Sequence, residues 1–365
     1  MGVIGTCRAL VIPEPGSMTL QDVAEAKPGP GEVAVRPVHV GICGTDLELL
    51  AGDVDPAYVR YPLVPGHEWS GVVETAGPGV TSVSPGQNVI AEGVIPCRSC
   101  DRCARGETNL CAHYDELGFT RPGAAADQVI VPAQVVHVLD GSVSLLEAAL
   151  AEPAAVAWRA ITRDPPRPGE HVAVVGDGTV ALIAAHLVGL FSPAEVVVHG
   201  LRPGQAGLAA ELGATAFEFS GPRDPSGPGL PEGALGRGAA AAPARSGRFD
   251  LVIEAAGTAA AVESAIALAR RGGRVILLGL AGNGVTARLP VDDVVNNDLR
   301  ISASFAYTSA AWAEVAGLLS SGQIRLGPLI THRFPLYRFE DAYRALRDPA
   351  GPRGKVMLDV TSGGG

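Results

Sequence analysis

The turn VVGDGTVA, with glycines at positions 176 and 178, restricts the possible folds of this chain more than any other feature of its sequence. It follows the apolar run HVAVV and precedes VALIAAHLVGLF, in which apolar residues recur at helical spacing. The segments EVVVHG, AGLAAELGA, FDLVIEAAG, AAVESAIALARRGG and RVILLGL continue this alternation between strand-like and helix-like character. Strands that alternate with helices of this length predict βαβ units and a doubly wound parallel sheet.

The same turn has the form G-x-G-x-x-A, which is typical of dinucleotide binding where it joins a strand to a helix. Gly176 permits the tight bend, and Gly178 lets the backbone approach a pyrophosphate. The small side chain of Ala181 allows the helix to pack closely on the strand. We therefore expect a dinucleotide cofactor at this turn, bound by Gly176, Gly178, Thr179 and Val180.

The first 150 residues differ in character from the rest. Short apolar runs such as EVAVRPVHVG, SGVVETAG and DQVIVP are broken by Gly and Pro, which predicts short strands in a β-rich domain. A helical pattern, LLEAALAEPAAVAWRAIT, is interrupted by Pro153 and ends in RDPPRPGE, which indicates a domain boundary. Because GKVMLDV near the end resembles a strand that rejoins the first part, we expect one domain over 1–155 and 304–365 and a second over 156–303.

One segment of the second domain departs from the alternating pattern. Of the 28 residues Ser220 to Gly247, 21 are Gly, Pro, Ala or Ser. This composition predicts a loose loop in place of a crossover helix, with a functional lid as the minor alternative.

Composition excludes several kinds of partner. The chain has 365 residues and a formal net charge of −10 without a basic block, which argues against nucleic acid or an anionic membrane surface as the main partner. It contains no run of 18 apolar residues, and its start does not resemble a secretory signal, so we expect a cytoplasmic protein. Only Lys27 and Lys355 among the 28 basic residues are lysines, which we interpret as a coding bias.

Four cysteines form the arrangement C-x2-C-x2-C-x7-C in PCRSCDRCARGETNLC. Two-residue gaps let successive thiolates converge on one centre, and four sulfurs suit a closed, tetrahedral zinc site. An iron–sulfur cluster and two disulfides are the alternatives. The sequence favours a structural zinc ion bound by Cys97, Cys100, Cys103 and Cys111.

Two further residues suggest a second metal site. A single cysteine such as Cys43 in GICGTD is usually a core residue, and a single histidine such as His67 in VPGHEW is often a turn residue. Together with the carboxylates of Glu68 and Glu152 they could form an open zinc site that leaves room for water or substrate. The sixth cysteine, Cys7, is expected in the core.

The succession of GICGTD, VPGHEW, a four-cysteine lobe at about 93–115, LAEP and the glycine-rich turn resembles the zinc-dependent medium-chain alcohol and polyol dehydrogenases, including the sorbitol and threonine dehydrogenases. The resemblance extends over nearly the whole chain. It implies a GroES-like β-rich catalytic domain, a Rossmann cofactor domain, and two zinc ions per chain, one catalytic and one structural. It further implies an alcohol or ketone as substrate and a homodimer or homotetramer that forms through the edge of the cofactor-domain sheet.

The resemblance also assigns residues to the catalytic zinc. Cys43 and His67 match its ligands, whereas Glu68 and Glu152 match acids that bind directly, bind through water or stay close by. Asp46 matches an acid that supports the imidazole of His67.

The resemblance assigns the first step of proton relay to the hydroxyl of Thr45. Many relatives have a histidine three residues further along, where this chain has Glu48. Either Glu48 or water therefore takes over the relay, or the proton path differs.

The resemblance places Gly200 where an NAD-binding protein has an acid that binds the adenosine ribose, and Arg202 follows two residues later. A missing carboxylate together with a guanidinium predicts a preference for NADP(H) over NAD(H). The alternative is a solvated arginine on an enzyme that uses NAD(H).

The class of substrate is less narrowly defined. Glu152 in LAEP matches the polyol branch, but Asn297 and Asp298 stand where sorbitol dehydrogenases have an Arg-Glu pair. VPGHEWSG followed by ELGFTRPGAAAD is similar to dehydrogenases of aminocyclitol pathways, so we expect a polyol, sugar or aminocyclitol. The competing hypotheses are an imine or enone reductase of the same fold and a non-catalytic binding protein. Retention of Cys43 and His67 favours the alcohol dehydrogenase.

Overall fold

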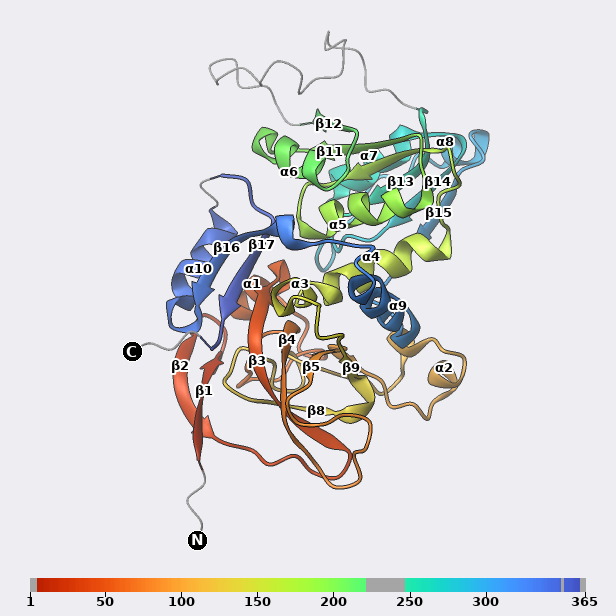
Figure 1. Cartoon of the computed structure of the whole chain (residues 1–365). Coiled ribbons are helices and arrows are strands. Elements are labelled where there is room, and N and C mark those ends of the chain that lie inside the picture. The colour runs from red at the N-terminus through yellow and green to blue at the C-terminus, as the bar shows by residue number, and fades with distance from the viewer. Residues whose placement is uncertain (1–4, 221–246, 349–350, 362–365) are drawn as a thin grey trace. The chain divides into compact units, whose positions relative to one another are not determined.

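The computed structural model describes residues 5–220, 247–348 and 351–361. The chain forms two compact units, one of residues 1–155 with 307–365 and the other of residues 156–306 (Figure 1). The boundary at residue 155 lies within helix α4 (Ala151–Arg163). Apart from Ser220 and Gly247, the segment that is rich in Gly, Pro, Ala and Ser lies outside the described residues.

The first unit is built on a sheet of seven strands in the order β16-β17-β3-β4-β5-β9, with β8 paired to β3. A separate hairpin, β1-β2, and a short pair, β6-β7, complete its β structure. The strands are β1 (Thr6–Val11), β2 (Thr19–Ala24), β3 (Glu32–Ile42), β4 (Glu68–Ala76), β5 (Asn88–Ala91), β6 (Val94–Ile95), β7 (Asp115–Glu116), β8 (Val129–Pro132), β9 (Val136–Val138), β16 (Ile330–Pro335) and β17 (Lys355–Asp359). The strand predicted at GKVMLDV is β17, which pairs antiparallel with β3.

Helices complete this unit, whose main core combines aliphatic side chains with Trp69 and Tyr343. They are α1 (Gly44–Ala51), α2 (Asp101–Ala104), α3 (Leu145–Ala148), the start of α4, α9 (Ser309–Ser320) and α10 (Phe339–Arg347). The predicted interruption by Pro153 is displaced: the chain breaks between α3 and α4, and Pro153 lies in the first turn of α4. Proline is tolerated in the first turn because the backbone N–H groups there have no partner within the helix.

The second unit is a doubly wound parallel sheet, as the sequence predicts. Its strand order, β12-β11-β10-β13-β14-β15, is that of dinucleotide-binding folds, and every neighbouring pair is parallel. The strands are β10 (His171–Val175), β11 (Glu195–Gly200), β12 (Ala216–Phe219), β13 (Phe249–Glu254), β14 (Ala269–Leu277) and β15 (Arg300–Ala303). Val172 to Val175 of β10 are all buried, which accounts for the uninterrupted apolar run in that strand.

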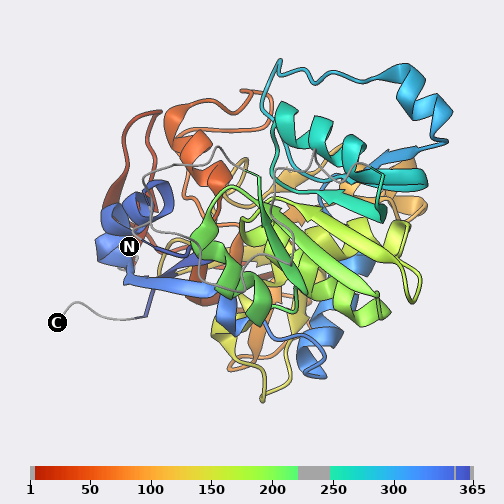
Figure 2. The ribbon, with the colours of Figure 1, turned by 90° about the horizontal axis from the view of Figure 1, so that it is seen from above.

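Helices cover both faces of this sheet (Figure 2). They are α5 (Thr179–Val188), α6 (Ala206–Glu211), α7 (Ala259–Leu268) and α8 (Val291–Asn296). One prediction differs: the helix expected through ARRGG ends at Leu268, and Ala269 already belongs to β14. Gly272 has a φ of 72°, and a Cβ on Gly273 would lie 2.6 Å from the carbonyl oxygen of Arg270. This glycine pair allows a bend that a helix could not contain.

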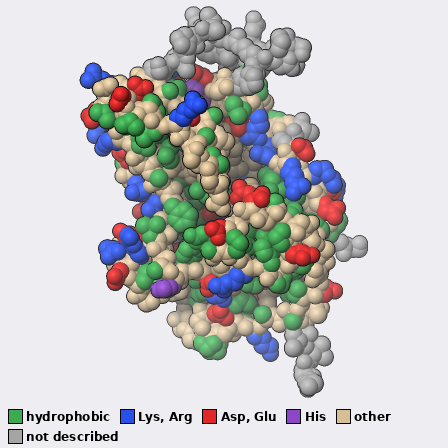
Figure 3. Space-filling view, turned by 180° about the vertical axis from the view of Figure 1, so that it is seen from behind, with side chains coloured by type: hydrophobic (Ala, Val, Ile, Leu, Met, Phe, Trp, Pro, Cys, Tyr) green, Lys and Arg blue, Asp and Glu red, His purple; other side chains and the backbone are tan. Residues whose placement is uncertain are grey.

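The surface of the described residues carries mixed charges. In Figure 3 the acidic and basic side chains are interspersed over the face that it shows, without a continuous basic patch. None of the helices in the described part of the chain is long and apolar enough to cross a membrane.

Candidate metal centres and cofactor site

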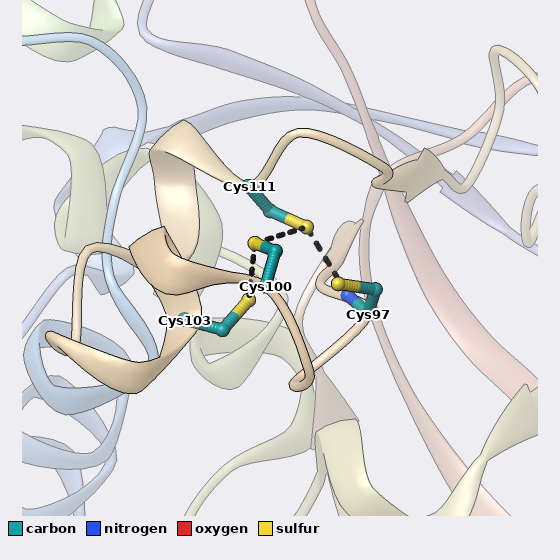
Figure 4. Close-up of side chains that lie close together, drawn as sticks. All are labelled: Cys97, Cys100, Cys103 and Cys111. Atoms are coloured by element: carbon teal, nitrogen blue, oxygen red, sulfur yellow. Dashed lines mark hydrogen bonds between the residues drawn. The ribbon is translucent and has the colours of Figure 1, made fainter.

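Four cysteine thiols meet in a lobe of the first unit (Figure 4). Their sulfur atoms all lie within 4.8 Å of one another, and Cys100 Sγ is 3.6 Å from Cys103 Sγ and 3.9 Å from Cys111 Sγ. A tetrahedron with Zn–S bonds of about 2.3 Å has edges of about 3.8 Å, so this spacing suits zinc. All six cysteines of the chain are free thiols in the structure.

The electrostatics of this cluster also suit a cation. Hydrogen bonds from Ser99 lower the pKa of Cys97 to about 5, whereas burial and the neighbouring sulfurs raise the pKa of Cys103 to about 12. The backbone N–H groups of Cys97 and His113 donate to Cys111 Sγ over 3.2 and 3.4 Å. Four thiolates this close together repel one another, so a positive ion is needed to balance their charge when all four ionise.

A second cluster combines Cys43, His67 and Glu68, whose ligand atoms lie within 4.8 Å of one another. Cys43 follows β3 and is the N-cap residue of α1, while His67 directly precedes β4. The antiparallel pairing of Gly41 with Glu68 brings these two segments together. One thiolate, one imidazole and one carboxylate form a donor set that suits zinc and leaves a fourth position open.

Gly41 lies directly against the side chain of Glu68. A Cβ there would lie 2.5 Å from Glu68 Oε2 and 3.3 Å from the Cβ of Glu68. The absence of a side chain at Gly41 therefore lets the carboxylate turn toward Cys43 and His67.

Asp46 connects the two segments of the cluster. Its Oδ2 accepts a hydrogen bond from Cys43 N at 2.8 Å, and its Oδ1 lies 3.8 Å from His67 Nδ1. Both residues are buried, and neither Asp46 Oδ1 nor His67 Nδ1 has a hydrogen-bond partner among the described residues. Burial alone would lower the pKa of His67, but Cys43, Asp46 and Glu152 raise it well above its usual value. The cluster thus concentrates negative charge that a bound cation would balance.

Lys355 is a member of this environment that we did not identify from the sequence. Its ammonium group is buried in β17, forms an ion pair with Glu68 Oε2, and donates to the carbonyl oxygen of Ile42 at 3.2 Å. Burial would lower the pKa of Lys355, but Glu68 and Cys43 raise it. We attributed the scarcity of lysine to coding bias and therefore missed Lys355, although a lone lysine within an apolar strand was a usable signal.

Glu152 lies in the first turn of α4, outside the compact group that contains Glu68. Burial raises its pKa to about 8, partly opposed by the charge of His67. The geometry of the described residues therefore favours Glu68 over Glu152 as the third donor. Tyr307, which we also did not identify from the sequence, is buried, and its hydroxyl accepts hydrogen bonds from Gly93 N at 2.8 Å and Val94 N at 3.1 Å.

The two relay candidates lie one turn apart on α1. Thr45 Oγ1 is 3.8 Å from Cys43 Sγ, which places the hydroxyl beside the cluster. Glu48 is exposed, three residues further along the same helix face. Glu48 is not a member of the cluster.

The glycine-rich turn has the geometry that its sequence suggests. Gly176 has a φ of 126°, and a Cβ on it would lie 3.0 Å from Ala256 N and 3.2 Å from the Cβ of Ala181. Gly178 is the N-cap of α5, and a Cβ there would meet nothing within 4 Å. Thr179 and Val180 form the first turn of α5, where backbone N–H groups are available to a phosphate.

The sequence predicted no carboxylate at the end of β11, but the structure places one there. Gly200 itself has no side chain, but Asp177, between the two glycines of the turn, approaches it closely. A Cβ on Gly200 would lie 2.8 Å from Asp177 Oδ2. Asp177 also forms an ion pair with Arg202, with Arg202 Nη2 2.6 Å from Asp177 Oδ1.

The parallel sheet of the second unit and the two clusters of candidate metal ligands agree with what comparisons with known proteins find. Residues 29–141 match the family described as Alcohol dehydrogenase GroES-like domain, and residues 176–321 match Zinc-binding dehydrogenase. D-xylulose reductase A of Aspergillus oryzae is 31% identical over 90% of this chain and 88% of its own length. L-threonine 3-dehydrogenase of Saccharopolyspora erythraea is 33% identical over 97% of this chain and 99% of its own.

A solved structure of a putative zinc-binding dehydrogenase from Sinorhizobium meliloti, bound to NADP, is 28% identical. It has a TM-score of 0.85 and covers 98% of this chain and 100% of its own. The chain therefore belongs to the zinc-dependent alcohol dehydrogenase family and is an enzyme of that family. The predicted pairing of a GroES-like domain with a Rossmann domain is confirmed.

Proposed function

We propose that this enzyme transfers a hydride between a secondary alcohol of the polyol, sugar or aminocyclitol type and a nicotinamide cofactor, with NADP(H) preferred over NAD(H). The observation that carries the proposal is the buried group of Cys43, His67 and Glu68. A protein that had kept only the fold would have no need for this donor set beside the four-cysteine lobe.

The residues that we propose as zinc ligands already lie close together in the structure. Cys43, His67 and Glu68 would hold a catalytic ion, and the four cysteines of the lobe would hold a structural one. When bound, the catalytic zinc supplies Lewis acidity toward a substrate oxygen. The closed set of four sulfurs leaves no position for substrate, so the structural site would stabilise the lobe without taking part in the reaction.

The residues around the cluster have separate proposed roles. Asp46 orients the imidazole of His67, because its carboxylate is buried and faces Nδ1. Lys355 holds Glu68 by a buried ion pair. Thr45 takes the proton of the substrate hydroxyl and passes it toward Glu48 or water on the exposed side of α1.

The proposed cofactor site combines two features of the second unit. The backbone of Gly176, Gly178, Thr179 and Val180 would bind the pyrophosphate at the start of α5. Arg202, beside Gly200, would face the 2′-phosphate of NADP(H). Among similar solved structures, the Sinorhizobium meliloti protein is bound to NADP and one from Escherichia coli CFT073 to NADH, so the proposed preference rests on Gly200 and Arg202.

The substrate class rests on the relatives and on the polar groups around the cluster. The two similar enzymes named above are a D-xylulose reductase and an L-threonine 3-dehydrogenase. Glu152, which is partly buried, and buried Tyr307 add polar groups near Glu68 and His67. A hydroxyl-rich substrate can form several hydrogen bonds with such groups, whereas an apolar alcohol offers only one hydroxyl.

We further propose that the enzyme is a homodimer or homotetramer formed through β15. This strand lies at the end of the parallel sheet, and exposed apolar side chains gather in the segment before it. They are Leu280, Val285, Leu289, Val291 and Val295. Light scattering coupled to size-exclusion chromatography measures the assembly, and a monomer would contradict the proposal.

Turnover with a substrate panel tests the proposed function. The purified, zinc-loaded protein would be assayed with simple alcohols, polyols, sugars and aminocyclitols, using NADP⁺ and NAD⁺ and the nicotinamide absorbance. We expect turnover of hydroxyl-rich substrates with a higher kcat/KM for NADP⁺. An absence of turnover with every alcohol, and of reduction of the matching ketones, would contradict the proposal. Metal analysis separates the alternatives, because two zinc ions per chain support the enzyme and one supports a non-catalytic protein.

A further inference from the structure

The loop that follows β11 presents hydrogen-bond donors that converge on one anion. The backbone N–H groups of Leu201 and Arg202 point to Asp177 Oδ2, at 3.0 and 2.8 Å. Nε and Nη2 of Arg202 donate to Asp177 Oδ1, at 3.1 and 2.6 Å. Two backbone N–H groups and a guanidinium form an arrangement suited to a phosphate as well as to a carboxylate.

In this structure the anion that accepts these hydrogen bonds is the carboxylate of Asp177, which lies in the glycine-rich turn. Asp177 stands between Gly176 and Gly178, and its carboxylate fills the space that a side chain at Gly200 would need. A Cβ on Gly200 would lie 2.8 Å from Asp177 Oδ2 and 2.5 Å from Phe217 Cζ. The acid that is missing from the end of the strand is thus replaced by one from the neighbouring turn.

We propose that Asp177 is a specificity-determining residue, whose carboxylate competes with the 2′-phosphate of NADP(H) for Arg202 and the two N–H groups of the loop. The proposal rests on the dinucleotide site of the proposed function, and it deepens that function. Asp177 accepts four hydrogen bonds from these donors. A 2′-phosphate can use the same donors only by displacing or sharing the carboxylate, and the two anions repel each other. NAD(H) has a neutral hydroxyl there and meets no such repulsion.

The loop is held by a second contact that does not depend on the carboxylate. Buried Gln205 donates from Nε2 to the backbone carbonyl oxygen of Asp177 at 2.7 Å, and Arg202 Nη2 donates to the same oxygen at 2.9 Å. Changing the side chain of Asp177 therefore leaves these contacts to its backbone intact. Asp177→Asn is the suitable substitution, since it keeps the shape and removes the charge.

The test compares the two cofactors in the full-length enzyme. For Asp177→Asn we expect the ratio of kcat/KM with NADP⁺ to kcat/KM with NAD⁺ to rise about tenfold, which corresponds to about 1.4 kcal/mol. The change should appear as a lower KM for NADP⁺ with little change in kcat. Glu211→Gln is the matched control, because exposed Glu211 in α6 loses the same charge and should leave the ratio unchanged. Adding Arg202→Ala to Asp177→Asn should remove most of the gain.

A binding measurement makes the test independent of turnover. Calorimetry with 2′,5′-ADP and with 5′-ADP should show that Asp177→Asn tightens only the 2′-phosphorylated fragment. An unchanged ratio, or a ratio that falls because the carboxylate positions Arg202 for phosphate, would overturn the proposal. Should Asp177→Asn fail to fold, Asp177→Ser provides the same two comparisons. A wild-type preference for NAD⁺ would contradict the NADP(H) part of the proposed function, yet a rise in the ratio would still support the role of Asp177.

Discussion

Lys355 and Glu68 form a buried ion pair that links the last strand of the first unit to the candidate catalytic cluster. Both side chains are almost completely withdrawn from solvent, and Glu68 also lies within ligand distance of Cys43 and His67. Once a metal is bound, Glu68 has two positive partners, the ammonium group of Lys355 and the metal ion. Such an arrangement holds the carboxylate in place beside the donor atoms of Cys43 and His67.

Removing the ammonium group should destabilise the protein. Lys355→Met leaves Glu68 buried without its cation, which costs about 3–5 kcal/mol in unfolding free energy. Urea unfolding of the metal-free protein measures this cost. Lys27→Met is the control, since Lys27 is the other lysine of the chain and is exposed. If the two variants were equally stable, the ion pair would have no structural role.

The four-cysteine lobe should hold one of the two zinc ions. Cys103→Ser removes one of its four ligands, so metal analysis should find a loss of one zinc per chain. We also expect a lower melting temperature, because a structural metal contributes directly to folding. Cys7→Ser should retain both ions, since Cys7 belongs to neither metal cluster. A Cys103→Ser protein that kept both zinc ions would contradict the assignment.

Two glycines of the dinucleotide turn should respond differently to substitution. Gly176→Ala introduces a Cβ at a φ of 126° against the backbone of Ala255 and Ala256, which should cost about 1–3 kcal/mol of stability. Gly178→Ala meets no protein atom within 4 Å, so the protein should keep its stability but bind the cofactor at least tenfold more weakly, because the backbone must approach the pyrophosphate. Thermal unfolding and cofactor titration separate these effects. Equal losses of stability in both variants would contradict this explanation.

Stability should fall on acidification for a reason unrelated to the metals. Burial lowers the pKa of His186, and likewise those of His39 and His199. As pH falls through the unfolded value of about 6.5, the unfolded chain takes up protons that the folded chain does not, so the unfolding free energy decreases toward the lower folded pKa. In His186→Gln this decrease should be smaller, by at most about 1.4 kcal/mol per pH unit. Urea unfolding at pH 7.5, 6.5 and 5.5 measures the difference, and parallel curves for wild type and variant would refute it.

Local patterns in the sequence were sufficient for much of the fold and for the metal clusters. The alternation after His171 predicted a doubly wound parallel sheet, because the periodicities of helices and strands can be recognised in consecutive residues. The spacing of Cys97, Cys100, Cys103 and Cys111 predicted a single thiol centre for the same reason. Cys43 and His67 lie further apart, and the family resemblance rather than their spacing indicated that they meet.

The register between distant strands, and the side-chain contacts that depend on it, were not predicted. Lys355 reaches Glu68 because β17 pairs with β3 and β3 pairs with β4, and no local pattern encodes that register. The carboxylate near Gly200 was missed for a related reason: it comes from the turn after β10, which is adjacent to β11 in the sheet but not in the sequence. A prediction made from the residues at the end of β11 could not include a side chain from the turn after β10.

Catalysis by a zinc ion bound to Cys43, His67 and Glu68 is tested by measuring zinc content and turnover together in wild type and His67→Ala. Zinc per chain would be determined on the same samples that are assayed for alcohol-dependent reduction of NADP⁺. We expect two zinc ions and turnover for the wild type, and one zinc ion without turnover for the variant. A wild type with a single zinc ion, or a His67→Ala variant with undiminished turnover, would contradict it.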